Sequence, residues 1–365
     1  MPRSVPGSVP GSVPGWLVGV VARFGVGRPV AVERTRHGLL NRVWLVTLER
    51  DRGEQDSDEQ DGGGRATWVL KQYLDDGGHA SSGALAAQHR TIAALAAAGL
   101  PTVPPVTAVD GRTLVLLRGR RYALFPFVEG TPPPTGRALP VAAAADLGTL
   151  LGRIHTELQR IQPPVLDPGP WPSADPLDTL RTIADLLAAA RSRARRDPAD
   201  PFDALAERRL LERRVLLATN AHRRPDARSA PPAGWVHGDF HPLNLLRRDG
   251  RVAAVLDWDR LGIKPLAEEA VRAATQFFCD ETSGVMDLPR ITAYARAYRA
   301  ASGATAEELA AAVHRVWWER LNDFWMLRWR YARRDDRASV LFPAAAGQIV
   351  WWTDHYQLVA EAYTR

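Results

Sequence analysis

The sequence is poor in the residues and segments that usually mark an exported or membrane protein. It has a single cysteine, Cys279, so no disulfide can form within the chain, and a buried thiol in a reducing compartment is the expected state. No apolar run approaches the roughly 18 residues that a membrane-spanning helix needs. The apolar stretch Trp16–Ala22 is short and is followed by Arg23, which makes it a poor signal-peptide core. These absences predict a cytoplasmic protein with no membrane partner.

Lysine is also scarce. Lys71 and Lys264 are the only lysines among 47 Lys and Arg residues, so a lysine that this arginine-rich chain retains is a candidate for a chemical role. Lys71 lies within Trp68–Tyr73, a run that is typical of a half-buried strand. Such a strand suits a lysine that directs its ammonium group at phosphates. An ordinary surface lysine on a strand is the alternative.

Basic residues are scattered along the chain, although the net charge is +6 and the pI is about 9.9. Arg191–Arg196 and Arg208–Arg214 fall in Ala- and Leu-rich helical segments that also carry acidic residues. That distribution is typical of solvated helix faces, whereas a nucleic-acid surface gathers its basic residues on one face. We therefore expect no nucleic-acid partner.

The length and composition predict more than one folding unit. A chain of 365 residues with 45% hydrophobic residues can bury a large core, and its length favours two domains or lobes. Residues 1–15 repeat Val-Pro-Gly-Ser and are expected to form a disordered tail outside the fold. The acidic segment Asp51–Gly64 ends in three glycines and is expected to be a long flexible hairpin loop between two strands.

Periodicity predicts a strand-rich N-terminal region that is followed mainly by helices. The expected strands are residues 28–36, Arg42–Leu48, Thr67–Tyr73, Val106–Val109, Thr113–Leu117 and Tyr122–Phe125, with an Ala-rich helix over residues 80–98. Further helices are expected over Ala142–Leu158, over residues 175–220 as a pair broken at Asp197–Pro201, and over Val316–Trp329. In the last of these, Glu319 and Asp323 would share a face. Its tryptophans are either core residues or a cation–π surface for a small cation.

The segment His237–Asn244 reads His-Gly-Asp-Phe-His-Pro-Leu-Asn, and Val-Leu-Asp-Trp-Asp follows at Val255–Asp259. The spacing of Asp239, Asn244 and Asp257 is the one that protein kinases use for a catalytic base and two Mg²⁺ ligands. Asp239 would orient an attacking hydroxyl and accept its proton. Two oxygen ligands suffice for Mg²⁺, which keeps several waters. The pattern predicts phosphoryl transfer, and a plain loop with an Asx turn is the alternative.

The residues between Asn244 and Asp257 predict a β-hairpin. Leu245-Leu246 and Val252–Leu256 read as two short strands, and Asp249-Gly250 between them is a turn signal. Such a hairpin would present Asn244 and Asp257 at its open end.

These motifs together resemble the aminoglycoside phosphotransferase family, which also includes choline, homoserine and related small-molecule kinases. The resemblance runs from Thr35–Trp44, similar to the family's nucleotide loop, through Val69–Lys71 to the two segments above. It implies an α+β, protein-kinase-like bilobed fold with a small antiparallel β-sheet N-lobe and a larger, mainly helical C-lobe. The expected division is residues 16–127 for the nucleotide-binding lobe and residues 128–365 for the catalytic and acceptor-binding lobe.

The resemblance also implies a role for each matched residue. Asp239 resembles the catalytic base, Asn244 and Asp257 the metal ligands, and Lys71 the residue that steadies the α- and β-phosphates. The remaining nucleotide-binding candidates are Gly38 and Asn41 in the matched loop, and Phe127 in the hinge segment Pro126–Gly130, where backbone groups would meet the base. The implied cofactors are Mg²⁺ and ATP or GTP as the phosphoryl donor.

The chain departs from the family pattern at three places. Gln88 stands where the Glu partner of the lysine is expected, and Gln can hydrogen-bond an ammonium group but supplies no charge. The nucleotide loop has Gly38 as its only glycine. Lys264-Pro265 replaces the family's frequent Asp-Pro, so the identity of the acceptor is not carried over.

The resulting prediction is a small-molecule O-phosphotransferase. Its acceptor is the hydroxyl group of an aminoglycoside, another antibiotic or a small metabolite, with antibiotic resistance as one role. The alternative, motivated by Gln88 and the single glycine, is a catalytically silent kinase-like module that binds a nucleotide or metabolite and regulates a partner. A protein-serine kinase is disfavoured because no activation segment follows Asp257. The sequence leaves the oligomeric state and the choice between ATP and GTP open.

Overall fold

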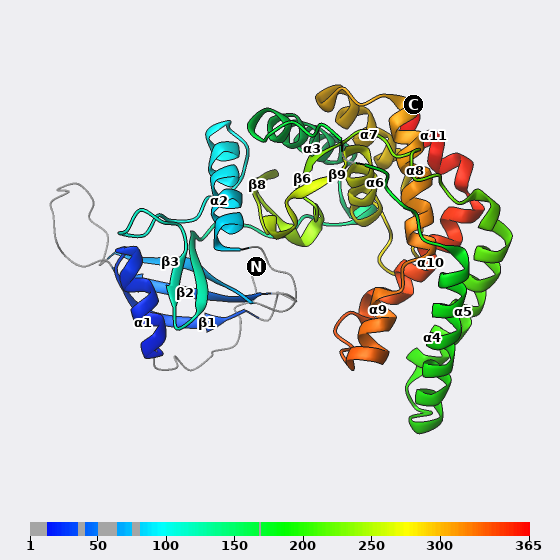
Figure 1. Cartoon of the computed structure of the whole chain (residues 1–365), viewed down its shortest axis with the longest axis horizontal. Coiled ribbons are helices and arrows are strands. Elements are labelled where there is room, and N and C mark those ends of the chain that lie inside the picture. Colours follow the sequence, from blue (N-terminus) through cyan, green and yellow to red (C-terminus); the bar gives the residue numbers. More distant parts are fainter. Residues whose placement is uncertain (1–12, 36–40, 50–63, 75–80, 168) are drawn as a thin grey trace. The chain divides into compact units, whose positions relative to one another are not determined.

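The computed structural model of the chain describes residues 13–35, 41–49, 64–74, 81–167 and 169–365. They form two compact units (Figure 1). The first unit comprises Met1–Thr131 and Leu246–Leu256, and the second comprises Pro132–Leu245 and Asp257–Arg365. The predicted tail falls mostly outside the described residues, and helix α1 begins at Gly15. The lobe boundary expected after Phe127 stays a prediction.

The first unit is built on a five-stranded antiparallel sheet with the order β1-β2-β3-β5-β4. Its strands are β1 (Arg28–Arg34), β2 (Arg42–Glu49), β3 (Arg65–Tyr73), β4 (Val115–Leu117) and β5 (Arg120–Pro126). Val46 and Leu70 are fully buried and pack in one core with Leu17 of α1 (Gly15–Val21). Strands β1, β2 and β3 confirm the first three predicted strands. The expected acidic loop lies almost entirely outside the described residues.

Helix α2 (Ser82–Ala97) confirms the predicted Ala-rich helix of the first unit. The Ser81 hydroxyl caps its first turn by accepting a hydrogen bond from the Ala84 backbone N–H (3.2 Å). Gly99, which has a φ of 77°, follows its end. Leu85, Gln88, His89, Ile92 and Leu95 recur at helical spacing and are buried, so they form the buried side of the helix.

One predicted strand of this unit is wrong. Val106–Val109 is not a strand, although the Val106 N–H donates to the Leu124 carbonyl. The chain turns back directly afterwards, because the Ala108 N–H bonds the Arg112 carbonyl across Asp110-Gly111. Pro104 and Pro105 precede the segment and have no N–H to donate to a neighbouring strand.

The second unit is mainly helical. Its helices are α3 (Val141–Ile161), α4 (Pro176–Arg196), α5 (Pro201–Asn220), α6 (Leu266–Phe277), α7 (Leu288–Ser302), α8 (Ala306–Leu321), α9 (Trp325–Arg328), α10 (Phe342–Asp354) and α11 (Tyr356–Thr364). Helices α3, α4 and α5 confirm the predictions over residues 142–158 and 175–220. Helix α3 packs closely against α7 at Gly148. A Cβ atom added to Gly148 would stand only 2.2 Å from the Tyr294 carbonyl oxygen, which shows how closely the two backbones approach.

The predicted continuous helix over Val316–Trp329 is wrong. Helix α8 ends at Leu321, α9 begins at Trp325, and Trp329–Arg333 forms a π-helical turn. The Asn322 side chain donates back to the Trp318 carbonyl (2.7 Å) and so stops α8. Asp323 therefore lies outside the helix and does not share a face with Glu319. Trp317 and Trp318 are fully buried, so this part of the aromatic segment is core.

Two short pairs of strands complete the fold. Strand β6 (Ala233–Val236) pairs antiparallel with β9 (Gly262–Pro265), and β7 (Leu245–Arg248) pairs with β8 (Arg251–Val255). Asp249 and Gly250 join β7 to β8 with positive φ values of 51° and 79°, which is the pattern of a type I′ turn. The predicted hairpin is thus confirmed.

Two further findings bear on the sequence predictions. Cys279 is buried, and this burial raises the pKa of its thiol to about 12. Among the residues that the structure describes, no helix combines the length and the apolar content needed to cross a membrane.

Candidate active site

The loop His237–Asn244 of the second unit carries the first predicted motif. It follows strand β6 directly, and His237 at its start is fully buried. Gly238 has a φ of 85°, and a Cβ atom on it would stand 2.1 Å from the Arg260 carbonyl oxygen. Only glycine fits both the left-handed backbone and this close approach. The Gly of the His-Gly-Asp motif therefore allows the loop to pack directly against the segment that follows Asp257.

The buried carboxylate of Glu269 holds the loop through hydrogen bonds to its backbone. Glu269 of α6 accepts hydrogen bonds from the backbone N–H groups of His237 (3.1 Å) and Gly238. The Nε2–H of His155 on α3 donates to the same carboxylate (2.8 Å), and a further hydrogen bond joins His155 Nδ1 to the Tyr298 hydroxyl (3.0 Å). Burial raises the pKa of Glu269, but the hydrogen bond and charge of His155, with His237 and the Gly238 N–H, outweigh it and lower the pKa. Glu269 is therefore an ionised anchor for the two residues that precede Asp239.

Asp239 is bordered by two basic side chains. Its Oδ2 lies 3.7 Å from Nε2 of His241 and 3.8 Å from Nε of Arg260. Burial raises the pKa of Asp239, but the nearby imidazole of His241, together with the charges of Arg260 and His237, lowers it overall. The Asp239 side chain remains 30% exposed. It is therefore an accessible carboxylate that stays ionised at neutral pH, as a proton acceptor must.

Asn244 is tied to the same loop. Its Nδ2 donates to the Asp239 carbonyl (2.9 Å), and the residue is only 8% exposed. This bond fixes the amide plane and directs Oδ1 away from that carbonyl. Asn244 directly precedes β7 and Asp257 comes two residues after β8, so the hairpin has both residues at its open end, as predicted.

Asp257 has an unusual backbone conformation. Its φ of 57° and ψ of 65° are left-handed, which for a residue with a side chain costs on the order of 1 kcal/mol. Positions of this kind concentrate at functional sites. The residue is exposed and is followed by the short 3₁₀ turn Trp258–Arg260.

The donor set around the hairpin fits Mg²⁺. Asn244 and Asp257 offer an amide oxygen and a carboxylate, the hard oxygen ligands that Mg²⁺ prefers beside waters and phosphates. No group of three His, Cys, Asp or Glu side chains that could hold a metal occurs within the described parts of the chain. A site with two protein ligands suits an ion that is also coordinated by a nucleotide.

The nucleotide-binding candidates lie in the first unit. Lys71 is half-buried on β3, and the Asn41 side chain accepts a hydrogen bond from the Leu74 N–H (3.2 Å), which joins the start of β2 to the end of β3. Phe127 follows β5 directly and is 42% exposed. Gly38 lies outside the described residues. The roles expected for these residues stay predictions.

Sequence reasoning missed two residues of the loop's surroundings. By its position in the sequence, Glu269 is a candidate only for the acceptor side, and no motif singles out Arg260. An acid just inside the helix that follows the second motif, four residues after the proline Pro265, is a weak signal for such an anchor. His155, by contrast, lies in the predicted helix over Ala142–Leu158, where the sequence favours packing beneath the loop over a catalytic role, and the structure confirms that packing.

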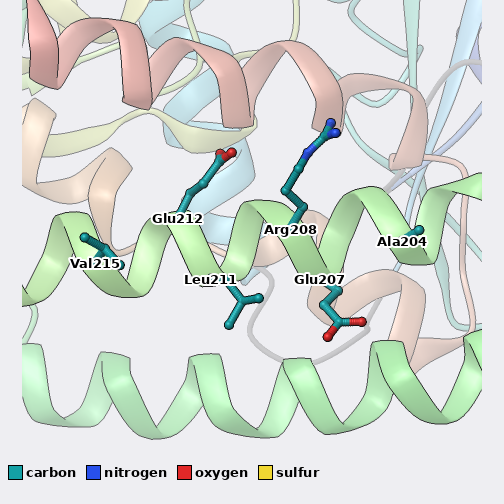
Figure 2. Close-up of a pocket in the computed structure, with 6 residues that line it drawn as sticks. All are labelled: Ala204, Glu207, Arg208, Leu211, Glu212 and Val215. Carbon is teal, nitrogen blue, oxygen red and sulfur yellow. The ribbon is translucent and has the colours of Figure 1, made fainter.

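A shallow hollow of about 510 Å³ lies elsewhere in the second unit, and α5 alone provides its lining. Figure 2 shows Glu207 and Leu211 on one side of α5, and Arg208 and Glu212 pointing to the other side. Glu207 is also paired with Arg191 of α4 (2.7 Å). None of the predicted site residues lines this hollow, so it is a packing feature of the helices.

Comparison with known sequences shows which proteins the chain is similar to. The sequence profile of the phosphotransferase enzyme family, APH, matches residues 31–304. A homoserine kinase of Granulibacter bethesdensis is 30% identical over 220 residues, which cover 60% of this chain and 60% of that protein. A homoserine kinase of Burkholderia lata is 25% identical over 252 residues, covering 64% and 68% of the two chains. The chain thus matches about two thirds or less of the length of these relatives.

Solved structures share the fold. A microcompartment-associated aminopropanol kinase superposes with a TM-score of 0.57 at 18% identity, covering 95% of this chain and 98% of that one. A spectinomycin phosphotransferase in complex with ADP and spectinomycin gives a TM-score of 0.57 at 13% identity, with 93% and 97% covered. At these identities the likeness concerns the fold alone, and it confirms the predicted α+β, kinase-like class.

Proposed function

The chain belongs to the phosphotransferase enzyme family, and from this premise we propose that it is a small-molecule kinase that phosphorylates an alcohol group. The observation that carries the proposal is the loop at Asp239. There an ionised, accessible carboxylate sits on a backbone held by Glu269, and the Asn244 side chain bonds the Asp239 carbonyl.

In the proposed reaction, Asp239 accepts a hydrogen bond from the acceptor hydroxyl and orients its oxygen toward the γ-phosphorus of ATP or GTP. The new oxygen–phosphorus bond forms as the bond to the bridging oxygen of the diphosphate breaks, and the hydroxyl proton passes to Asp239. Asn244 and Asp257 would hold Mg²⁺, which neutralises charge on the phosphates when bound. Lys71 would steady the α- and β-phosphates.

For the acceptor, we infer a small hydroxylated metabolite of the homoserine type rather than an aminoglycoside. The homoserine kinase relatives favour it. The surroundings of Asp239 support it as well, because Arg260, whose side chain is 54% exposed, and His241 border the carboxylate. Basic groups beside the base disfavour a polycationic acceptor.

The test is release of ADP or GDP, measured with Mg²⁺ across homoserine, choline, amino alcohols, sugars and aminoglycosides. We expect release that homoserine-type acceptors stimulate, and a loss of about 10²- to 10⁴-fold in Asp239→Asn. Asp249→Asn is the matched control, because it removes a carboxylate from the turn of the hairpin while Asn preserves the left-handed conformation. Turnover at the wild-type rate in Asp239→Asn would reject the assignment. Nucleotide binding without turnover for any acceptor would favour a silent regulatory module.

A further inference from the structure

In the first unit, a chain of hydrogen bonds between neutral side chains joins helix α2 to the sheet. The Tyr73 hydroxyl of β3 bonds Nε2 of His89 on α2 (3.0 Å), and Nδ1 of the same ring bonds the Thr113 hydroxyl (2.8 Å). His89 is 1% exposed and Tyr73 is 5% exposed. The set of Tyr73, His89 and Thr113, called here the Tyr–His–Thr chain, therefore has two buried members and a partly buried end at Thr113.

This chain reaches the phosphate-binding lysine through the ring of Tyr73. Lys71 and Tyr73 are two positions apart on β3, so their side chains leave the same face of the strand. The Lys71 ammonium nitrogen lies 5.2 Å from the centre of the Tyr73 ring, within the range of a cation–π contact. The orientation of that ring is fixed at its far end by the bond from its hydroxyl to His89.

The charge state of His89 suits this arrangement. Burial, and then the positive charge of Lys71, lower the pKa of His89 to about 4. The imidazole is therefore neutral at physiological pH, with one nitrogen that donates and one that accepts. Both are used, because the ring bridges two hydroxyl groups. A neutral bridge supports the lysine without placing a second positive charge beside it.

The residue next to His89 on the buried side of α2 also differs from the family pattern. Gln88 occupies the buried side of α2 at the position where the family resemblance expects a Glu partner for the lysine. A glutamine contributes hydrogen bonds but no charge. His89, the next residue on the same buried side, provides a tie to β3 that needs no ion pair.

We propose that Tyr73, His89 and Thr113 are positioning residues for Lys71, and that their chain sets the affinity of the protein for a nucleoside diphosphate or triphosphate. This inference rests on the proposed function, in which Lys71 contacts the phosphates. The three residues act through Lys71 and do not themselves touch the nucleotide. Their substitution is therefore expected to matter only while Lys71 is present.

A double-mutant cycle tests this dependence. Tyr73→Phe keeps the ring and removes only the hydroxyl. It is made alone and combined with Lys71→Ala, and the dissociation constants for Mg-ADP and Mg-GDP are measured by titration calorimetry. We expect Tyr73→Phe to weaken binding about fivefold in the wild-type background and to have no further effect once Lys71 is alanine. His89→Gln, whose amide both donates and accepts, is expected to bind more tightly than His89→Leu.

Thr102→Val is the matched control. The Thr102 hydroxyl donates to the Ile92 carbonyl of α2 (2.9 Å), so the substitution also removes a tie to α2 but leaves the Tyr–His–Thr chain intact. We expect it to lower the melting temperature without changing nucleotide affinity. Thr113→Val, the same change at the end of the chain, is expected to weaken binding.

The possible results distinguish the positioning role of the Tyr–His–Thr chain from the proposed kinase function. Unchanged affinity in Tyr73→Phe and His89→Leu, or equal weakening with and without Lys71, would overturn the positioning role while leaving the proposed kinase intact. Equal effects of Thr102→Val and Thr113→Val on affinity would overturn it as well. A wild-type protein that binds neither nucleotide would overturn both proposals.

Discussion

The two units support their candidate catalytic groups by opposite means. In the second unit, the carboxylate of Glu269 holds two backbone N–H groups of the loop before Asp239. In the first unit, neutral groups, namely the Tyr73 and Thr113 hydroxyls and the His89 ring, lie behind Lys71. A buried anion is costly to leave unpaired, whereas a neutral hydrogen bond contributes about 1 kcal/mol. We therefore expect substitutions that disturb the loop before Asp239 to be more destabilising than substitutions in the Tyr–His–Thr chain behind Lys71.

The largest effect is expected from Glu269→Ala. It leaves two buried N–H groups and His155 without their shared acceptor, so we expect a loss of about 4 kcal/mol in unfolding free energy, together with loss of catalytic rate. Urea unfolding and the phosphoryl-transfer rate are the measurements. Glu269→Gln is the matched control, since it keeps one acceptor oxygen and nearly the same volume. If Glu269→Ala were as stable as the wild-type protein, Glu269 would not be the anchor of the loop.

The next effect is expected from a pair of glycine substitutions. Gly238→Ala places a Cβ atom 2.1 Å from the Arg260 carbonyl oxygen at a φ of 85°, and we expect about 3 kcal/mol of destabilisation. Gly250→Ala in the hairpin turn has a similar φ of 79° with nothing within 4 Å of the added atom, so only about 1 kcal/mol is expected. Denaturant midpoints of the two variants measure the difference. Equal losses would show that the close approach to Arg260 does not constrain the loop.

A third prediction concerns the different pH ranges in which His89 and Glu269 affect the stability of the protein. The pKa of His89 is lowered from 6.5 to about 4. Between these values the unfolded chain binds a proton that the native protein does not, so stability falls as pH decreases through this window. The contribution is at most about 3 kcal/mol. The pKa of Glu269 is lowered from 4.5, so the stability that it contributes is present above that value and is lost only in stronger acid.

Urea unfolding of His89→Gln at pH 7 and pH 5 checks this prediction. The variant is expected to lose less stability than the wild-type protein over that interval, because Gln does not titrate. Glu269→Gln should show no such difference between pH 7 and pH 5. A wild-type slope in His89→Gln would mean that His89 is not the group that titrates.

Local features of the sequence were sufficient to predict the structure where the residues of a motif are close together in the chain. The hairpin followed from Asp249-Gly250, whose residues accept the left-handed conformations of a type I′ turn. The loop motif places Asp239 and Asn244 five positions apart on one segment, and the structure joins them by a hydrogen bond from the Asn244 side chain to the Asp239 carbonyl. Their proposed roles stay predictions, since a hydrogen bond between the two residues does not by itself assign either of them a part in catalysis.

Contacts between distant segments were harder to predict. Glu269 bonds the loop, and His155 bonds Glu269, although many residues separate these positions in the sequence. Local sequence patterns do not predict such long-range contacts. The end of α8 at Leu321 depends on the Asn322 side chain, which competes with the apolar periodicity that favours a continuous helix. The segment Val106–Val109 reads as a strand by composition, but the turn at Asp110-Gly111 ends its pairing.

The assignment of Leu246–Leu256 to the first unit has a consequence for synthesis on the ribosome. Thr131 exchanges two backbone hydrogen bonds with Arg247 (3.0 and 2.7 Å), yet more than a hundred residues of the second unit are translated between them. A nascent chain that has just emerged through Thr131 therefore holds an incomplete first unit, with those backbone groups still exposed to water. The first unit reaches its full set of contacts only after Leu256 has left the exit tunnel. A fragment that ends at residue 131 therefore lacks Leu246–Leu256, which are part of the same unit.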